Sequence, residues 1–173
     1  MMKKALAAIS ILMCLAAFIS CAANPQKAPS GAFSKADLGV NIGGQIYYLR
    51  EDSAKLLAAL GDGCDYSEMV SCVYDGKDKT FIYPGISVNT VPAGAKDMIE
   101  MITLTDANYE TLRGVSVGDT MDKLAAAYGE KYFDDGYITY SLTNDPYDIQ
   151  SERIQFYFED GVINTIYIYS PSY

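Results

Sequence analysis

The sequence predicts an α+β fold built from short helices and antiparallel β-meanders. Two stretches have the apolar spacing of a short helix, and each is followed by runs of alternating apolar and polar residues that turn signals separate. The alternation is clearest at 153–159, where every second residue is Ile or Phe, and Asp160-Gly161 then marks a tight hairpin. We therefore expect a single α+β domain over residues 35–173.

Residues 1–20 have the layout of a signal peptide. Lys3 and Lys4 precede an uncharged apolar run that ends at Ser20, and this run is shorter than a membrane-spanning helix requires. Phe-Ile-Ser-Cys at positions 18–21 resembles the lipobox of bacterial lipoproteins, in which the cysteine thiol is lipidated and becomes the new N-terminus. The resemblance implies lipid attachment at Cys21. Conventional cleavage after Ala23 is the alternative.

Export and a lipid at Cys21 would place the protein on the outer face of the cytoplasmic membrane, or on the periplasmic side of an envelope membrane. Residues 21–34 hold two prolines and a glycine and read as a flexible tether of at most about 45 Å. Loss of residues 1–20 leaves eleven Lys and Arg against twenty-two Asp and Glu, a net charge of −11. Phosphate backbones repel such a chain, so we expect no nucleic-acid partner and expect the acyl chains to provide the membrane contact.

Two segments, DSAKLLAALG at 52–61 and DTMDKLAAAYG at 119–129, have the same helical pattern. Each begins with Asp and a Ser or Thr at the N-cap position and ends with a glycine suited to the C-terminal cap. We expect a short helix in each, packed on a sheet because helices of this length are marginal alone. An internal duplication is predicted, with units at about 45–105 and 112–169. An α+β chain without duplication is the alternative.

The predicted strands follow each helix in order. The first unit offers KTFIY, a Pro84-Gly85 turn, ISVNTV and MIEMITLT, and the second offers YITYSL, RIQFYFE and VINTIYIYS. The run MVSCVYDGKDK, at 69–79, is expected to form an added strand and turn that the second unit lacks.

Two longer patterns resemble known families. GDTMDKLAAAYG at 118–129 and FEDGVINTIYIY at 158–169 resemble the repeat of β-lactamase inhibitory proteins and small outer-membrane assembly lipoproteins. SCVYDGKDKTFIYPGISVNTVP and ITLTDANYETLRGVSVGDT look more like a group of uncharacterised lipoproteins from clostridia and related Gram-positive bacteria, over most of 37–169. The distant relatives imply tandem helix-plus-sheet units whose sheet face grips a partner protein. The resemblance carries over no catalytic residue.

Cys64 and Cys72 are the two cysteines that remain after export and lipidation. Because disulfides persist outside the cytoplasm, we predict a bridge between them. Two free thiols, or half of a metal site, are the alternatives. The chain has no histidine, and two cysteines are too few for a typical structural zinc site, so we expect no metal and no cofactor.

No catalytic signature is present in the sequence. Without histidine there is no Ser-His-Asp or Cys-His pair, and neither a Ser-x-x-Lys motif at a helix start nor a Gly-x-x-x-x-Gly-Lys loop occurs. We predict a protein that is not an enzyme and that has no catalytic residues.

Tyrosine is unusually frequent, with fifteen residues and no tryptophan. On the last predicted strand, the face with Ile166 and Ile168 is the expected core, and Tyr167 and Tyr169 lie on the other face with Tyr157 of the preceding strand. Exposed tyrosines on a sheet suit protein recognition, because they offer contact area at low entropic cost. Tyr157, Tyr167 and Tyr169 are therefore candidate binding residues. Packing or cross-strand stabilisation is the alternative.

The leading hypothesis is a non-catalytic, lipid-anchored envelope protein whose sheet face binds an envelope or extracellular protein or ligand. The alternatives are a solute-binding accessory protein, a hydrolase that uses acidic residues without histidine, and a structural spacer.

Overall fold

The computed structural model describes residues 27–171, so the predicted signal peptide and Cys21 lie outside the described part. It contains the 3-10 turn η1 (Lys35–Asp37) and the helices α1 (Ala54–Leu60) and α2 (Met121–Tyr128). Within these residues, no helix has the length and apolar character to cross a membrane. The strands are β1 (Gly39–Ile42), β2 (Gln45–Tyr48), β3 (Asp65–Val70), β4 (Lys77–Tyr83), β5 (Ile86–Ala93), β6 (Lys96–Leu104), β7 (Phe133–Asp134), β8 (Ile138–Ser141), β9 (Arg153–Glu159) and β10 (Val162–Tyr169).

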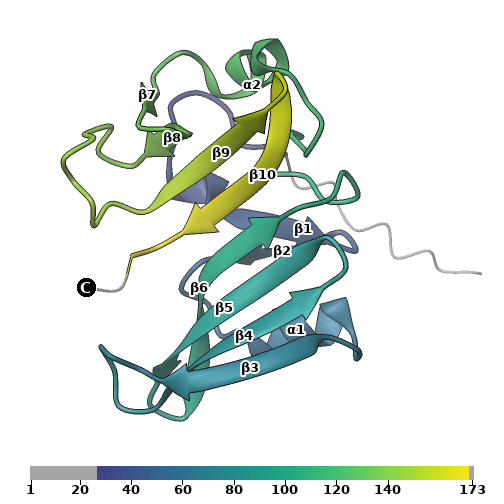
Figure 1. Ribbon diagram of the computed structural model, residues 1–173, viewed down its shortest axis with the longest axis vertical. Coiled ribbons are helices and arrows are strands. Elements are labelled where there is room, and N and C mark those ends of the chain that lie inside the picture. Colours follow the sequence, from purple (N-terminus) through teal and green to yellow (C-terminus); the bar gives the residue numbers. More distant parts are fainter. Residues whose placement is uncertain (1–26, 172–173) are drawn as a thin grey trace, which may run out of the picture.

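Eight of the strands form one antiparallel sheet in the order β3-β4-β5-β6-β10-β9-β8-β7 (Figure 1). Its centre is the β6·β10 pair, in which Ile166 lies opposite Leu104 and Ile168 opposite Ile102. The separate hairpin β1–β2 forms a second, two-stranded sheet. The expectation of an α+β fold is confirmed, with strand as the larger share.

Each half of the chain runs from one helix into four strands, and the sheet order reads outward from the centre as β6-β5-β4-β3 and β10-β9-β8-β7. The halves also differ. β3 has six residues where β7 has two, and the β1–β2 hairpin precedes only the first half. The predicted first unit began inside this hairpin, at residue 45, whereas β2 pairs with β1 and not with the large sheet. Internal duplication stays a prediction.

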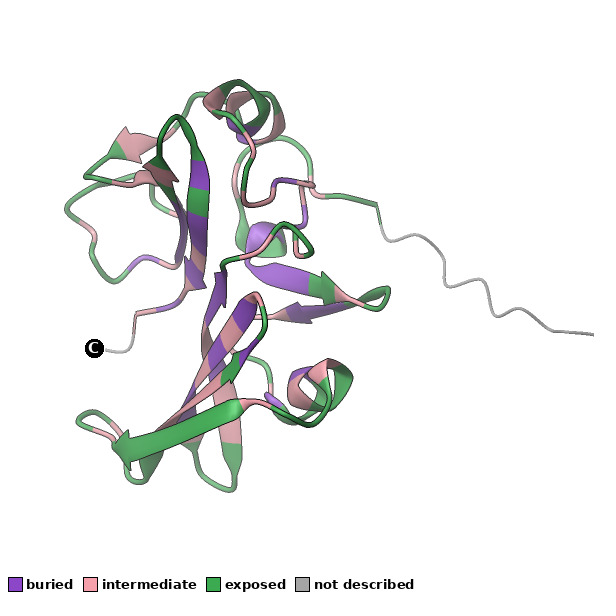
Figure 2. Cartoon of the chain, turned by 45° about the vertical axis from the view of Figure 1, so that its right-hand side comes forward, coloured by how far each residue is buried: buried purple, intermediate pink, exposed green. Residues whose placement is uncertain are grey.

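One face of the large sheet carries the core. The two helices and the β1–β2 hairpin all lie on this face, and the buried residues concentrate between them and the strands (Figure 2). Leu56 of α1, Leu124 of α2 and Val40 of β1 are fully buried in the same cluster. Neither helix is long enough to be stable alone, so burial against the sheet is what holds them.

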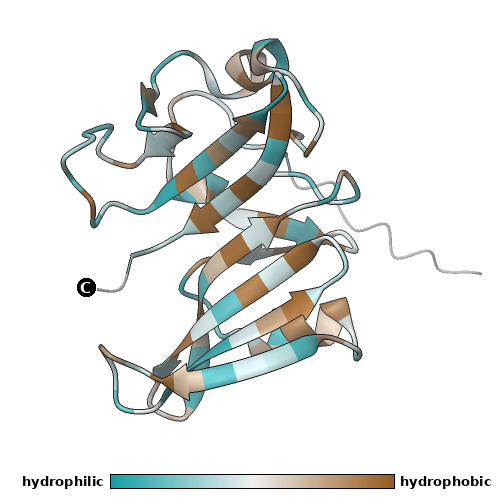
Figure 3. Cartoon of the chain, viewed as in Figure 1, coloured by the Kyte–Doolittle hydropathy of each residue, from teal (hydrophilic) through white to brown (hydrophobic). Residues whose placement is uncertain are grey.

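Strand alternation explains which face is buried, and Figure 3 shows hydrophobic and hydrophilic residues alternating along β9 and β10. Ile154, Phe156, Ile166 and Ile168 are fully buried, which confirms the predicted core face. Ile163 departs from simple alternation: its spacing from Tyr167 and Tyr169 predicts that it shares their face, but the structure buries it completely. The register of β9 and β10 shifts between Ile163 and Thr165, and a bulge of this kind moves one residue to the other face.

The turns follow the sequence signals. Asp160 and Gly161 have φ values of 51° and 82°, and two consecutive left-handed residues fit the tight hairpin predicted between β9 and β10. Gly85, in the turn between β4 and β5, has φ of 79°. A Cβ at Gly85 would lie 2.5 Å from Cβ of Asp106, so backbone conformation and space both require glycine there.

Cys64 and Cys72 are not bonded to each other in the structure. Cys64 directly precedes β3 and Cys72 lies two residues after it, so the six residues of the strand and Ser71 separate them. An extended strand of that length spans about 20 Å. Cα atoms joined by a disulfide lie about 4.4–6.8 Å apart. A bridge within this chain would therefore require β3 to change its path, and the disulfide stays a prediction.

Candidate binding face

The sheet face opposite the helices carries a cluster of three tyrosines, Tyr137, Tyr157 and Tyr167. The ring centroid of Tyr137 lies 5.8 Å from that of Tyr157 and 5.9 Å from that of Tyr167, and the second contact is edge-to-face. Both spacings suit favourable aromatic pairs. Tyr157 is 39% exposed, and the other two are half-buried. The cluster thus presents aromatic surface to solvent while its rings hold one another in place.

The strand register sets this arrangement. Tyr157 lies opposite Thr165, and Tyr167 lies opposite Gln155, so the two tyrosines are diagonal neighbours on β9 and β10. In the same cross-strand row as Tyr167, Gln155 Nε2 donates to Thr139 Oγ1 at 3.0 Å, and Thr139 Oγ1 donates to Asp135 at 3.1 Å. Gln155 and Thr139 are both buried. The tyrosines therefore have polar neighbours on this face whose hydrogen bonds are already made.

Tyr169 lies apart from this cluster. It pairs with Arg153 across β9 and with Met101 across β6, and the Arg153 guanidinium carbon lies 5.7 Å from its ring centroid. Of the three candidate binding residues, the structure brings Tyr157 and Tyr167 together through Tyr137. It places Tyr169 at the end of β10, in the wall of a cavity.

That cavity, of about 290 Å³, lies where the β3–β4 turn approaches the end of β10. Two carboxylates, Asp78 and Glu100, line it together with Tyr74, Tyr169 and Met101. Asp78 Oδ1 is buried and accepts no hydrogen bond from the described residues. A buried oxygen of this kind costs free energy unless a donor satisfies it. The full lining is Ser71, Val73, Tyr74, Asp78, Val91, Glu100, Met101, Tyr169, Ser170 and Pro171.

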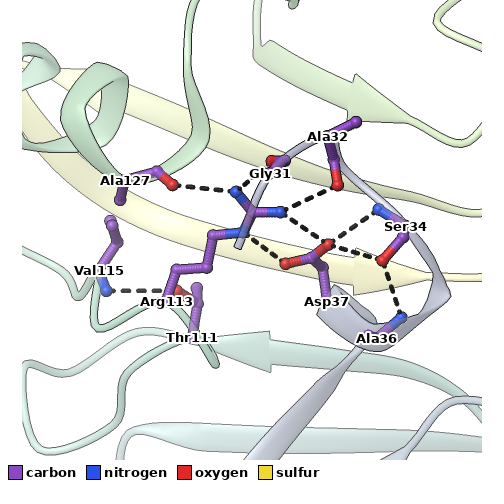
Figure 4. Close-up of polar contacts among 9 residues, drawn as sticks. All are labelled: Gly31, Ala32, Ser34, Ala36, Asp37, Thr111, Arg113, Val115 and Ala127. Carbon is purple, nitrogen blue, oxygen red and sulfur yellow. Dashed lines mark hydrogen bonds and ion pairs between the residues drawn. The ribbon is translucent and has the colours of Figure 1, made fainter. Parts of the chain in front are cut away.

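A buried ion pair on the opposite side of the sheet joins the N-terminal segment to the loop before α2. Arg113 Nε donates to Asp37 Oδ1 at 2.5 Å, and Nη2 donates to Oδ2 at 3.0 Å (Figure 4). The side chains are 4% and 0% exposed, respectively. Bidentate, charge-assisted bonds of this kind are among the strongest that side chains make. The hydrogen bond with Asp37 raises the pKa of Arg113, so the guanidinium is charged at neutral pH.

The remaining donors of Arg113 bind main-chain carbonyls. Nη1 donates to the oxygens of Gly31 and Ala127, each at 3.0 Å, and Nη2 donates to Ala32 O at 3.3 Å (Figure 4). Ala127 lies in the last turn of α2. One guanidinium therefore ties together the start of the described chain, the η1 turn and the C-terminal end of α2.

Aromatic packing reinforces this junction. The ring centroid of Phe33 lies 6.4 Å from that of Tyr128 on α2 and 6.2 Å from that of Tyr140 on β8. The Tyr140 hydroxyl donates to Gly129 O at 2.6 Å, and burial raises the pKa of Tyr140 to about 12. Gly31 and Phe33 therefore contact the folded domain. The sequence predicts that both belong to the flexible tether, and the tether boundary stays a prediction.

Sequence reasoning missed the ion pair and Tyr137. Ser34 and Asp37 do have the spacing of a capping box, and both of its hydrogen bonds are present in η1. That spacing could have indicated an ordered turn at 34–37. No local pattern could indicate the partner of Asp37, because Arg113 is 76 residues away. Tyr137 begins the predicted strand YITYSL and lies one residue before β8, but alternation along one strand does not identify the rings on neighbouring strands that it contacts.

Comparisons with known proteins show no relative. No family model, no curated protein and no solved structure matches the chain. In residues 27–171, no group of three or more Cys, Asp and Glu side chains is placed to hold a metal ion. The site must therefore be interpreted from its own geometry.

The Arg113→Ala variant should be strongly destabilised. It would leave the Asp37 carboxylate buried without its cation, and breaking a buried pair in this way costs about 3–5 kcal/mol. The matched control is Lys35→Ala, because Lys35 forms a 3.4 Å ion pair with Glu152 while it is 79% exposed. Removing an exposed pair should cost at most about 1 kcal/mol. Urea unfolding of the two variants checks this, and equal losses of stability would contradict the role given to Arg113.

Proposed function

We propose that this chain is a non-catalytic, lipid-anchored protein of the cell envelope that binds a partner protein through the outer face of its sheet. The observation that carries the proposal is the cluster of Tyr137, Tyr157 and Tyr167, which is partly open to solvent on a face that no helix covers. Amphipathic aromatic residues on a rigid sheet supply contact area with little loss of conformational entropy.

The placement of the N-terminal segment supports this proposal. Arg113 and the aromatic contacts of Phe33 hold residues 31–34 on the helix side of the sheet. A chain anchored through Cys21 would therefore enter the domain from the side opposite the tyrosine cluster. The binding face would then be directed away from the point of attachment, where a partner has access to it.

A second candidate function is the binding of a small solute. The cavity beside Tyr169 favours it, because Asp78 and Glu100 lie in one aromatic-walled space and Asp78 Oδ1 has no hydrogen-bond donor among the described residues. Such a lining suits an organic cation better than an anion. The structural-spacer hypothesis has no comparable observation in its favour.

The anchor is tested by the intact mass of the protein from the membrane fraction. We expect a chain that begins at Cys21 and carries a diacylglyceryl group, and we expect Cys21→Ser to release the protein from the membrane. An unmodified chain that begins at Asn24 would contradict the anchor.

The binding face is tested by photo-crosslinking in the native host. One crosslinking residue replaces Tyr157, and a matched control replaces Lys123, whose side chain is 51% exposed on α2. We expect one discrete adduct from position 157 and none from position 123. The purified partner should then bind the unmodified protein, and Tyr137→Ser together with Tyr167→Ser should weaken that binding at least tenfold.

Two outcomes would contradict the proposal. The same adduct from both positions would show contact without a preferred face. No adduct at position 157 in a folded, membrane-anchored protein would assign the tyrosines to packing and favour the cavity.

A further inference from the structure

β3 is an unusually open edge of the large sheet. It pairs only with β4, and all six of its residues are exposed, as the green strand at the bottom of Figure 2 shows. The opposite edge of the sheet is β7, which has only two residues. Proteins usually shorten, bulge or cover such edges, because a free edge can pair with another strand. β7 follows that rule, and β3 does not.

The hairpin register identifies which main-chain groups of β3 are free. Ser71 N donates to Gly76 O at 3.0 Å, which makes Ser71 and Gly76 a hydrogen-bonded pair. Hydrogen-bonded and non-hydrogen-bonded pairs alternate along an antiparallel ladder. The pairing of β3 with β4 continues from there without a register shift. The N–H and C=O groups of Asp65, Ser67 and Met69 therefore point toward β4.

The main-chain groups of Tyr66, Glu68 and Val70 consequently point outward. Of the described residues, none makes a main-chain hydrogen bond to them outside the β3–β4 ladder. These three residues form a template of alternating donors and acceptors about two residues apart, which is the spacing that an added strand requires.

The side chains at this edge define the chemistry of a partner. Tyr66 is 51% exposed, Met69 67% and Val70 76%, so apolar groups are present on both faces of the strand. The charge is negative, because residues 62–79 contain five acidic residues and two basic residues, Lys77 and Lys79. Lys77 already forms an ion pair with Glu68. The acidic residues of this range are Asp62, Asp65, Glu68, Asp75 and Asp78.

We propose that β3 binds an extended segment of a partner protein by strand addition, and that this segment alternates Lys or Arg with apolar residues. Charge complementarity selects this occupant. A second copy of the chain would bring an equally acidic edge against β3, and the net charge of −9 adds further repulsion. The proposal concerns the edge of the sheet far from the tyrosine cluster, so it does not depend on the proposed function of that face.

Residue-resolved hydrogen exchange tests the proposal on the full chain in neutral detergent. The probe is the peptide acetyl-Lys-Val-Lys-Thr-Lys-Val-Lys-amide, and the control peptide has Glu in place of every Lys. With the basic peptide, the amides of Tyr66, Glu68 and Val70 should exchange at least tenfold more slowly. The amides of Ser67 and Met69, already bonded to β4, should not change.

A pair of variants separates main-chain pairing from side-chain contact. Val70→Pro removes an outward N–H without removing a bond to β4, and Val70→Ala keeps the N–H while removing the side chain. We expect Val70→Pro to weaken binding of the basic peptide at least tenfold and Val70→Ala to change it less than threefold.

Three results would overturn the proposal. If the basic peptide slows exchange in the unaltered chain equally at all amides of residues 65–70, or at none of them, strand addition is excluded. This test does not depend on whether Val70→Pro folds. Equal binding of the acidic peptide would exclude selection by charge. Protection that appears without peptide and grows with protein concentration would assign the edge to self-association.

Discussion

The buried ion pair of Arg113 and Asp37 is the constraint on which the architecture depends. It lies in the layer that packs on the sheet, among α2, η1 and the start of the described chain, and it uses the guanidinium to bind a carboxylate and three carbonyls at once. Burying two charges costs free energy that only good geometry and further hydrogen bonds offset. Asp37 meets that requirement, because it also accepts from Ser34 N at 2.8 Å.

This junction fixes where the N-terminal segment lies relative to the two proposed binding surfaces. The N-terminal segment is held against α2 and β8 on the core side of the sheet, so the sheet lies between it and the tyrosine cluster. The β3 edge lies at the far end of the same sheet, seven strands from β7. The two proposed binding surfaces, the face with the tyrosine cluster and the β3 edge, therefore lie apart from each other on the sheet, and the N-terminal segment lies on the face opposite the tyrosine cluster.

Local chemistry predicted much of the fold. The Thr120 cap of α2, strand alternation and the Asp160-Gly161 turn depend on neighbours in sequence, and those predictions hold in the structure. Ser53, the predicted cap of α1, makes no side-chain cap hydrogen bond. Errors arose where a non-local contact or a local irregularity decides the outcome. The bulge near Thr165 reversed the face of Ile163. The disulfide between Cys64 and Cys72, which lie beyond the two ends of the extended strand β3, stays a prediction.

The candidate site was less predictable than the fold for the same reason. Tyr157 and Tyr167 could be paired from strand alternation, because they lie on adjacent strands of one hairpin. Tyr137 contacts the ring of Tyr167 only because of where β8 lies in the sheet. Tyr169 contacts the Arg153 guanidinium at the end of β10 instead. The openness of β3 depends on which strand lies at the edge of the sheet, a property of the whole topology rather than of residues 65–70.

A double-mutant cycle on Arg113 and Asp37 tests the central claim most directly. The free energy of unfolding would be measured for Arg113→Met, for Asp37→Asn and for the combined variant. Each single substitution should leave the other buried side chain unpaired. The combined variant should therefore lose less stability than the sum of the two single variants, by at least about 2 kcal/mol. Additivity within about 0.5 kcal/mol would show that the two side chains act independently, and it would contradict the claim that their pairing holds the N-terminal segment in place.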